Sequence, residues 1–153
     1  MNIETYKPEY KEAFIAMNLA WIEEMFQVED EDRMVLGSIE ERLANGGEIF
    51  FAINDEGEIM ASCMVAPLPS GEWEIEKFAA KKEFAGQGAG KACLQACMDF
   101  IKEKQIQKVI IVSNRKCVSA IHLYRKFGFI EIPVDKNKFP YERADIAFEQ
   151  YFE

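Results

Sequence analysis

Histidines, zinc-type cysteine pairs and long apolar runs are scarce in this sequence, and each scarcity excludes a class of protein. Among 153 residues there is one histidine, and the four cysteines include no Cys-x-x-Cys pair. Cys93 and Cys97 lie four residues apart but have too few histidine partners for a zinc site, so we interpret them as small buried thiols and expect no metal. No stretch approaches the roughly 18 apolar residues of a membrane span, and the first residues form no apolar targeting segment. We therefore expect a cytoplasmic protein that does not enter a membrane.

An excess of basic residues is also missing. The chain has 18 lysines and arginines against 27 aspartates and glutamates, which gives a formal net charge of −9. This charge repels nucleic acid phosphates and anionic membranes, and it mildly favours cationic partners. The length and the 49% hydrophobic content are those of one soluble globular domain with a full core, so residues 1–153 are expected to form a single domain.

The stretch 72–104 carries the first functional signal. A β-like run at 73–80 leads into Gly86, Gly88 and Gly90, which directly precede a segment with the apolar spacing of a helix face. The apolar residues of that face are Ala89, Cys93, Cys97, Phe100 and Ile101. A helix that begins among glycines leaves main-chain N–H groups unpaired and open to a close approach by an anion. The stretch therefore predicts a phosphate-binding loop, although a glycine-rich turn that binds nothing has the same letters.

Two well-known nucleotide motifs do not fit this stretch. A P-loop needs a glycine five residues before the Gly-Lys pair and a hydroxyl after it, but Ala85 precedes and Ala92 follows Gly90 and Lys91. A dinucleotide-binding G-x-G-x-x-G that starts at Gly86 would end at Lys91. The sequence therefore excludes both readings.

The remaining sequence predicts an α/β (α+β) fold with the element order βααβββαβαββ. The run Val-Ile-Ile-Val at 109–112 is typical of a central strand that is buried on both faces and reached by a right-handed crossover. Ser38 and Glu41 form a predicted capping box for a helix that ends near Asn45, and the acidic residues 29–32 before it are interpreted as a solvated linker. The predicted strands are 3–6, 49–53, 58–65, 73–80, 109–112, 129–134 and 143–152, and the four predicted helices begin at Pro8, after Ser38, near Ala89 and near Cys117.

Two motifs at the right separation resemble those of the GNAT N-acetyltransferases. The glycine stretch resembles their acetyl-CoA motif, (Arg/Gln)-x-x-Gly-x-(Gly/Ala), with Gly88 and Gly90 on the glycine positions. The stretch 113–129 is similar to the family's Asn-containing turn and Ala-Ile-x-Leu-Tyr helix, here Ala120, Ile121, Leu123, Tyr124, Gly128 and Phe129. Residues 74–80 and 18–23 resemble a bacterial subgroup with a Glu-Leu-x-Lys-x-Ala-Val strand four, so the resemblance covers nearly the whole chain.

The resemblance implies a GNAT fold, with a mixed central sheet of about seven strands and four helices. It implies direct transfer of an acetyl group from acetyl-CoA to a primary amine on a small molecule or peptide, with no metal and no acetyl-cysteine. Homodimers are common in the family, and the sequence decides neither the dimer nor the acceptor. The residues carried over as acetyl-CoA contacts are Phe78, Ala79, Ala80, Ala85, Gly86, Gln87, Gly88, Ala89, Gly90, Lys91 and Asn114.

Three positions depart from the family pattern. Ala85 replaces the Arg or Gln that opens the glycine motif, which should weaken pyrophosphate binding without abolishing it, and Gln87 and Lys91 could compensate. Cys117 stands where many members have Asn, which leaves Asn114 as the polar contact. Ala80 replaces the usual Val at the end of strand four, where the family uses main-chain groups.

Acetyl transfer to an amine needs a base and an acid. A lysine-like amine has a pKa of about 10.4 and must lose a proton before it attacks a thioester, and Glu74, with Glu76 second, is the predicted base, acting through water. Alternate strand residues share a face, so Glu74, Glu76, Phe78 and Ala80 are expected to point the same way. Tyr124 is predicted to protonate the departing thiolate.

Competing readings accompany each of these assignments. Both glutamates could be surface carboxylates, and Tyr124 could be a packing aromatic residue. His122, two residues away on the same helix, is interpreted as a surface residue. A non-catalytic acyl-CoA sensor or scaffold of the same fold, and a plain interaction domain, are the alternatives for the whole chain.

Overall fold

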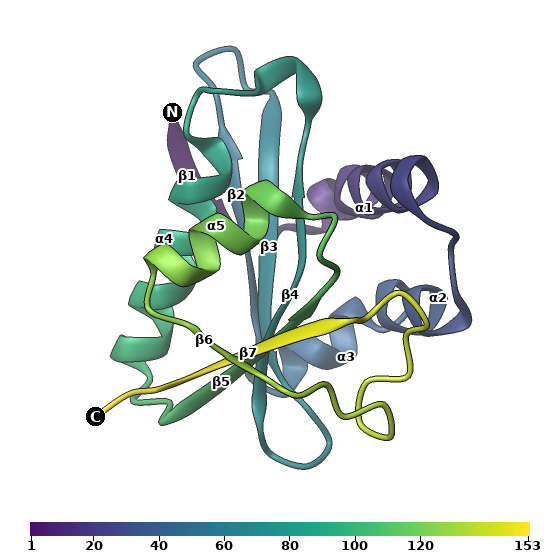
Figure 1. Ribbon diagram of the computed structural model, residues 1–153. Helices are drawn as coiled ribbons and strands as arrows, with labels where there is room; N and C mark the ends of the chain where they lie inside the picture. The colour runs from purple at the N-terminus through teal and green to yellow at the C-terminus, as the bar shows by residue number, and fades with distance from the viewer.

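The computed structural model describes residues 1–153 and contains one seven-stranded mixed sheet (Figure 1). The strand order is β1-β2-β3-β4-β5-β7-β6, and the β4–β5 pair is parallel while every other neighbouring pair is antiparallel. The strands are β1 (Asn2–Thr5), β2 (Glu48–Ile53), β3 (Ile59–Pro67), β4 (Trp73–Ala80), β5 (Lys108–Ser113), β6 (Ile130–Ile132) and β7 (Ile146–Tyr151). The predicted fold class is therefore confirmed.

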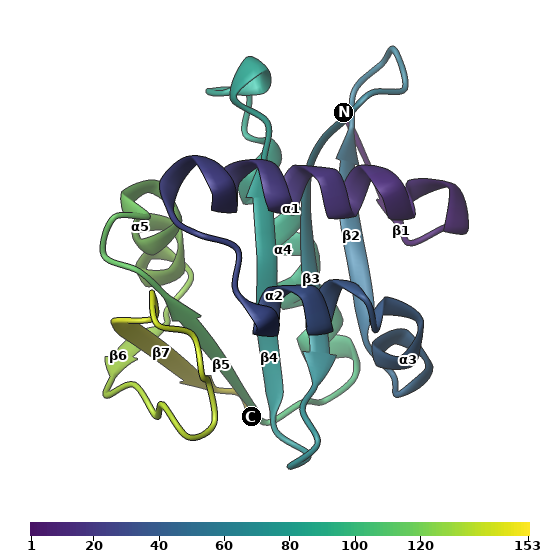
Figure 2. The same ribbon diagram turned by 90° about the vertical axis from the view of Figure 1, so that its right-hand side faces the viewer.

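Helices cover both faces of the sheet (Figures 1 and 2). They are α1 (Lys11–Met25), α2 (Asp30–Leu36), α3 (Ile39–Ala44), α4 (Ala89–Glu103) and α5 (Val118–Lys126), with short 3-10 turns at Pro8–Tyr10 and Lys82–Phe84. One core cluster joins the sheet to α1, α2 and α3, and the larger one joins it to α4 and α5. Cys93 and Cys97 lie fully buried in the larger cluster, as expected from the sequence. No helix is long and apolar enough to cross a membrane.

Helix α2 corrects the interpretation of the acidic segment 29–32 as a solvated linker. The segment starts a helix, and the N–H of Glu29 donates to Asp32 Oδ2 at 2.9 Å. The predicted capping box at Ser38 is wrong, because Ser38 Oγ donates to the carbonyl of Met34 at 2.9 Å. The missed signal is local, since acidic residues in a first turn favour a helix N-terminus and an apolar run from Met34 follows them.

Strands β4 and β5 separate soon after they meet. The two strands pair at two positions only, Trp73 with Val109 and Glu74 with Ile110. Figure 2 shows β5 leaning away from β4 beyond that point. The main chain of β4 is thereby left without a neighbour on this side, in the middle of the sheet.

A β-bulge at Lys77 changes which way the β4 side chains point. Ser62 and Met64 of β3 are two residues apart, but their partners Ala79 and Glu76 on β4 are three apart, and Lys77 has a φ of +53°. An extra residue of this kind reverses the alternation of faces. The expectation that Phe78 shares a face with Glu76 is therefore wrong, and Phe78 packs against the α4 and α5 side instead.

Candidate active site

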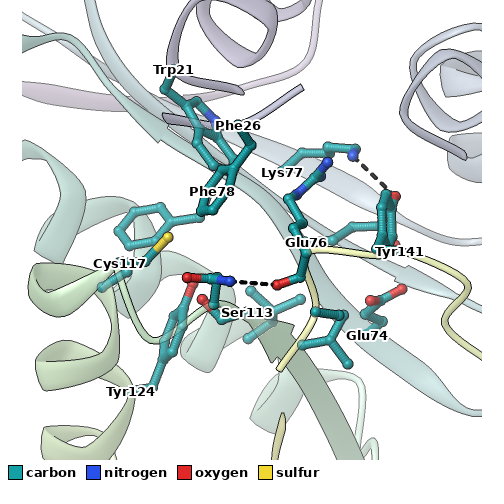
Figure 3. Close-up of a pocket in the computed structure, with 16 residues that line it drawn as sticks. Trp21, Phe26, Glu74, Glu76, Lys77, Phe78, Ser113, Cys117, Tyr124 and Tyr141 are labelled. Carbon is teal, nitrogen blue, oxygen red and sulfur yellow. Dashed lines mark hydrogen bonds between the residues drawn. The ribbon is translucent and has the colours of Figure 1, made fainter. Parts of the chain in front are cut away.

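A pocket of about 120 Å³ opens where β4 and β5 separate (Figure 3). It brings together the three predicted catalytic side chains, Glu74, Glu76 and Tyr124, with Phe78 and Asn114. The other lining residues are Trp21, Phe26, Ile75, Lys77, Val112, Ser113, Cys117, Ala120, Tyr141, Arg143 and Ala144. Elements far apart in the sequence thus converge on one cavity.

The glycine loop lies next to this pocket and has the geometry of an anion site. No main-chain carbonyl accepts from the amides of Gly86 or of residues 88–91, and the first helical bond of α4 runs from Ala92 to Gly88 at 3.0 Å. Gly86 and Gly88 have φ values of +81° and +78°, a region that side chains disfavour. Five free N–H groups at a helix N-terminus form a cradle suited to a phosphate.

Gly90 joins the cradle to the pocket. A Cβ at Gly90 would lie 3.1 Å from Phe78 Cζ, so a larger residue here would require the Phe78 ring to shift by a few tenths of an ångström. Ala85, Gln87 and Lys91 are exposed at the edge of the loop, where side chains can reach a bound anion.

Tyr124 is held by aromatic neighbours and is nearly inaccessible, with 5% of its surface exposed. Its ring lies 6.1 Å from that of Phe78 and 5.8 Å from that of Phe148. Burial raises the pKa of Tyr124 well above its usual value because it disfavours the charged phenolate. Tyr124 therefore packs against neighbouring aromatic rings and keeps its proton at the wall of the pocket. His122 of the same helix is exposed, as expected.

Glu74 and Glu76 form a carboxyl pair on the face of β4 that α1, α2 and α3 cover. They stand opposite Ala66 and Met64, which belong to the core cluster of that face. Burial, followed by the negative charge of Glu76, raises the pKa of Glu74 well above its usual value. Burial also opposes the ionisation of Glu76. The hydrogen bond that Glu74 donates and the charges of Arg42 and Lys77 outweigh this effect, so the pKa of Glu76 is lowered. These shifts favour the protonated form of Glu74 and the ionised form of Glu76.

A buried ion cluster forms the floor of the pocket, and the sequence analysis missed it. The carboxylate of Asp32 is fully buried and accepts from Arg143 Nη1 at 2.7 Å, Arg143 Nη2 at 2.6 Å and Lys77 Nζ at 2.9 Å. Lys77 also donates to the hydroxyl of Tyr141 at 3.1 Å, a contact visible in Figure 3. Because the partners come from α2, the β4 bulge and the segment before β7, no local sequence pattern could reveal the cluster.

Asn114 and Cys117 occupy the turn between β5 and α5. Asn114 Nδ2 donates to the carbonyl of Arg143 at 2.6 Å, and its Oδ1 accepts from the N–H of Lys116 at 2.8 Å. The side chain of Asn114 therefore already has two protein partners, while Cys117 lines the pocket beside Tyr124.

The mixed sheet opens at its one parallel strand pair, and a helix that follows glycines and has free N-terminal amides begins beside this opening. This arrangement defines the fold of the GNAT-type group-transfer enzymes. The model of the acetyltransferase (GNAT) family matches residues 8–129. The chain belongs to this family, so the resemblance inferred from the motifs is confirmed.

Solved structures of similar fold include several acetyltransferases. A GNAT-family acetyltransferase from Staphylococcus aureus is 24% identical, with a TM-score of 0.87 over 99% of both chains. An acetyltransferase from Streptococcus agalactiae is 15% identical, with a TM-score of 0.80 over 99% of this chain and 98% of the other. The PaiA N-acetyltransferase from Thermoplasma acidophilum, solved in complex with coenzyme A, is 18% identical, with a TM-score of 0.69 over 99% of this chain and all of the other. A search of curated protein sequences finds no significant match.

Proposed function

We propose that residues 1–153 act as one domain that transfers the acetyl group of acetyl-CoA directly to a primary amine. The observation that carries this proposal is the meeting of a proton-holding tyrosine and a buried carboxyl pair in one pocket, where β4 and β5 separate. The similar fold of the Thermoplasma acidophilum enzyme, which was solved in complex with coenzyme A, supports the donor.

The residues of the cradle fit the chemistry of the donor. Coenzyme A carries a pyrophosphate, and the free amides of Gly86 and of residues 88–91 are suited to binding it. Its acetyl-bearing arm would extend into the gap beside β4, where main-chain groups of Phe78, Ala79 and Ala80 could stabilise the negative charge that develops on the thioester oxygen.

Three proton transfers accompany the reaction, two at the nitrogen and one at the sulfur. The carboxyl pair takes a proton from the acceptor ammonium, which leaves a neutral amine that can attack the thioester carbon. A C–N bond forms, the C–S bond breaks, and Tyr124 protonates the departing thiolate. The nitrogen then loses its second proton, which replaces the one that Tyr124 gave up. A thiol has a pKa of about 8.5, and burial raises the pKa of Tyr124 above the usual tyrosine value of about 10. The enclosed site must therefore supply a short, direct contact for this transfer.

The proposal is tested with Tyr124→Phe, and Tyr151→Phe is the control because Tyr151 is 67% exposed at the end of β7. Calorimetric titration measures acetyl-CoA binding, and thiol release measures turnover with a panel of amines. Tyr124→Phe should bind acetyl-CoA like the wild type and lose about 10²-fold in kcat, the range of general acid catalysis. Binding without turnover on any amine would favour a sensor, and no binding would refute the cradle.

A further inference from the structure

We infer that Glu74 and Glu76 form an ammonium-binding site that exchanges its own proton for the acceptor cation, and that the acceptor is a small amine with an apolar carbon skeleton and no second charge. The inference rests on the proposed function and names the substrate class of the same pocket. It depends on which charges around the pocket already have partners and on what the remaining walls are made of.

The two carboxyl groups differ in their partners. Arg42 Nη1 lies 3.0 Å from Glu76 Oε2, and both side chains are largely buried, with 14% and 10% of their surfaces exposed. Glu74 is 4% exposed, lines the pocket and forms no ion pair. The charges of Arg42 and Lys77 act on it from nearby, but Arg42 is paired with Glu76 and Lys77 with Asp32. A protein cation therefore pairs with one of the two carboxyl groups and leaves the other for a ligand.

The cations that line the pocket are not free to bind an acceptor. Lys77 is paired with Asp32 and donates to the hydroxyl of Tyr141. Arg143 is bound by both oxygens of Asp32 and lies 3.3 Å from Glu29 Oε2. A carboxylate on the acceptor would therefore have to displace an existing buried ion pair.

The wider surroundings of the pair carry mixed charge. Glu31, on α2, is half-buried, and burial followed by the charge of Glu76 raises its pKa, but it does not line the pocket. Burial, followed by the charges of Glu76 and Glu74, raises the pKa of Tyr141 far above its usual value, so its hydroxyl stays neutral. Glu74 is thus the one lining carboxyl group that a cationic ligand can bind without breaking an ion pair.

Aromatic rings form the wall that the rest of the acceptor would meet. Trp21 and Phe26 pack edge to face with their centroids 6.3 Å apart, and Phe78 and Tyr141 line the same pocket. Arg143 stacks on three of these rings, 4.5 Å from that of Tyr141 and 5.9 Å from those of Trp21 and Phe26. A carboxylate pressed against this wall would lose its water without gaining a partner, and a second ammonium would meet the like charge of Arg143, which already lies over the ring faces.

The proton balance of the exchange is complete. Arg42 pairs with only one of the two buried carboxyl groups, so in the proposed site the free pair holds one proton and one negative charge. An entering ammonium ion displaces that proton to solvent and is held by two carboxylates. The ammonium then returns a proton to the pair and becomes the attacking amine. After attack the nitrogen loses a second proton, which replaces the one that Tyr124 gives to the sulfur.

Three four-carbon amines test the substrate class, with thiol release from acetyl-CoA as the assay. n-Butylamine carries the ammonium alone, 4-aminobutanoate adds a carboxylate at the far end, and 1,4-diaminobutane adds a second ammonium. We expect kcat/KM to be at least about 10-fold lower for both charged derivatives than for n-butylamine. An uncompensated desolvation cost of about 1.4 kcal/mol for the second charged group is enough for that factor. Preference for either derivative over n-butylamine would overturn the assignment.

Binding without turnover tests the exchange itself, with coenzyme A in place of acetyl-CoA. Titration of n-butylamine in phosphate and in MOPS, whose ionisation enthalpies differ and which contain no primary amine, counts the protons released. Wild type should release about one proton for each amine bound, and Glu74→Gln, a shape-matched variant, should bind at least about 10-fold more weakly and release none. Equal binding and equal proton release by the two proteins would refute the inference.

The two proposals fail in different ways. If acetyl-CoA is bound and any amine releases thiol, the transferase proposal holds even when the order of the three amines is wrong. If n-butylamine fails to bind to the wild-type complex with coenzyme A, the ammonium site is refuted whether or not another amine is acetylated.

Discussion

Replacing Asp32 with asparagine keeps the shape of the side chain and removes the charge that holds the floor of the pocket together. Asp32 is fully buried and is the shared partner of Lys77 and Arg143. Asparagine would leave two buried cations facing an uncharged amide. We therefore expect Asp32→Asn to fold but to be markedly less stable than the wild type at neutral pH.

The size of the loss can be worked from the pKa of Asp32. Burial opposes its ionisation, but the hydrogen bonds from Arg143 and the charge of Lys77 outweigh this and lower its pKa from 3.8 to about 2. At about 1.4 kcal/mol for each pKa unit, the charged form stabilises the fold by about 2.5 kcal/mol. Removal of one partner from a buried ion pair typically costs about 3 to 5 kcal/mol. An expected loss of about 2 to 4 kcal/mol follows.

Urea unfolding at pH 7 measures this loss, and Asp30→Asn is the matched control on the same helix. Asp30 is fully exposed and pairs only with Arg33, so its replacement should change the free energy of unfolding by about 0.5 kcal/mol or less. The KM for the acceptor amine should rise for Asp32→Asn and stay unchanged for Asp30→Asn, because only Asp32 joins α2 by ion pairs to residues that line the pocket.

The stabilisation by Asp32 should depend on pH. The pKa of Asp32 is lower in the folded state, so its contribution is fully present above about pH 4, its unfolded value, and is lost as the pH falls through about 2. Wild type and Asp32→Asn should therefore converge in stability over this window. The reasoning is refuted if Asp32→Asn is as stable as Asp30→Asn at pH 7, or if its deficit stays constant down to pH 2.

Two further substitutions have matched controls. Gly88→Ala and Gly57→Ala both place a side chain at positive φ, +78° and +80°, with open space around the new Cβ, so each should lose about 1 to 2 kcal/mol in thermal or urea unfolding. Only Gly88→Ala should also weaken acetyl-CoA binding by calorimetry, because Gly57 lies in the β2–β3 turn; equal affinities would contradict the cradle. Arg42→Met removes the cation that lowers the pKa of Glu76, so the acidic limb of the kcat/KM profile for amine acetylation should move to higher pH. Arg33→Met, at an exposed ion pair, should leave the profile unchanged, and equal profiles for both variants would argue against a role of Glu76 in proton transfer.

The sequence predicted the features that short-range patterns determine. The run 73–80 is β4 with the predicted bounds, and the helix expected near Ala89 is α4. Both signals are local, since one is a β-type run and the other is an apolar face that follows glycines with free amides. The convergence of Glu74, Glu76 and Tyr124 on one pocket came from the family resemblance, because their elements meet only through the sheet order.

What the sequence did not predict depends on contacts between distant segments. The bulge at Lys77 arises where β3 and β4 fall out of register, and neither strand alone indicates it. Because of this bulge, period-two reasoning placed Phe78 on the wrong face. The burial of Asp32 depends on Arg143, which is 111 residues away, so the acidic segment resembled a solvated surface.

The short β4–β5 pairing has a consequence for how the molecule opens. Two residue pairs join the strands, so the sheet consists of two leaves that share a narrow main-chain seam. Above it, side chains bridge the leaves, through Asp32 and Arg143 on one face and through Phe78 and Tyr124 on the other. Amides of β4 that face the gap should exchange hydrogen with solvent faster than those that pair with β3. A ligand that spans the gap would connect the two leaves and stabilise them relative to each other. Slower hydrogen exchange along that edge of β4 would therefore report ligand binding before any product forms.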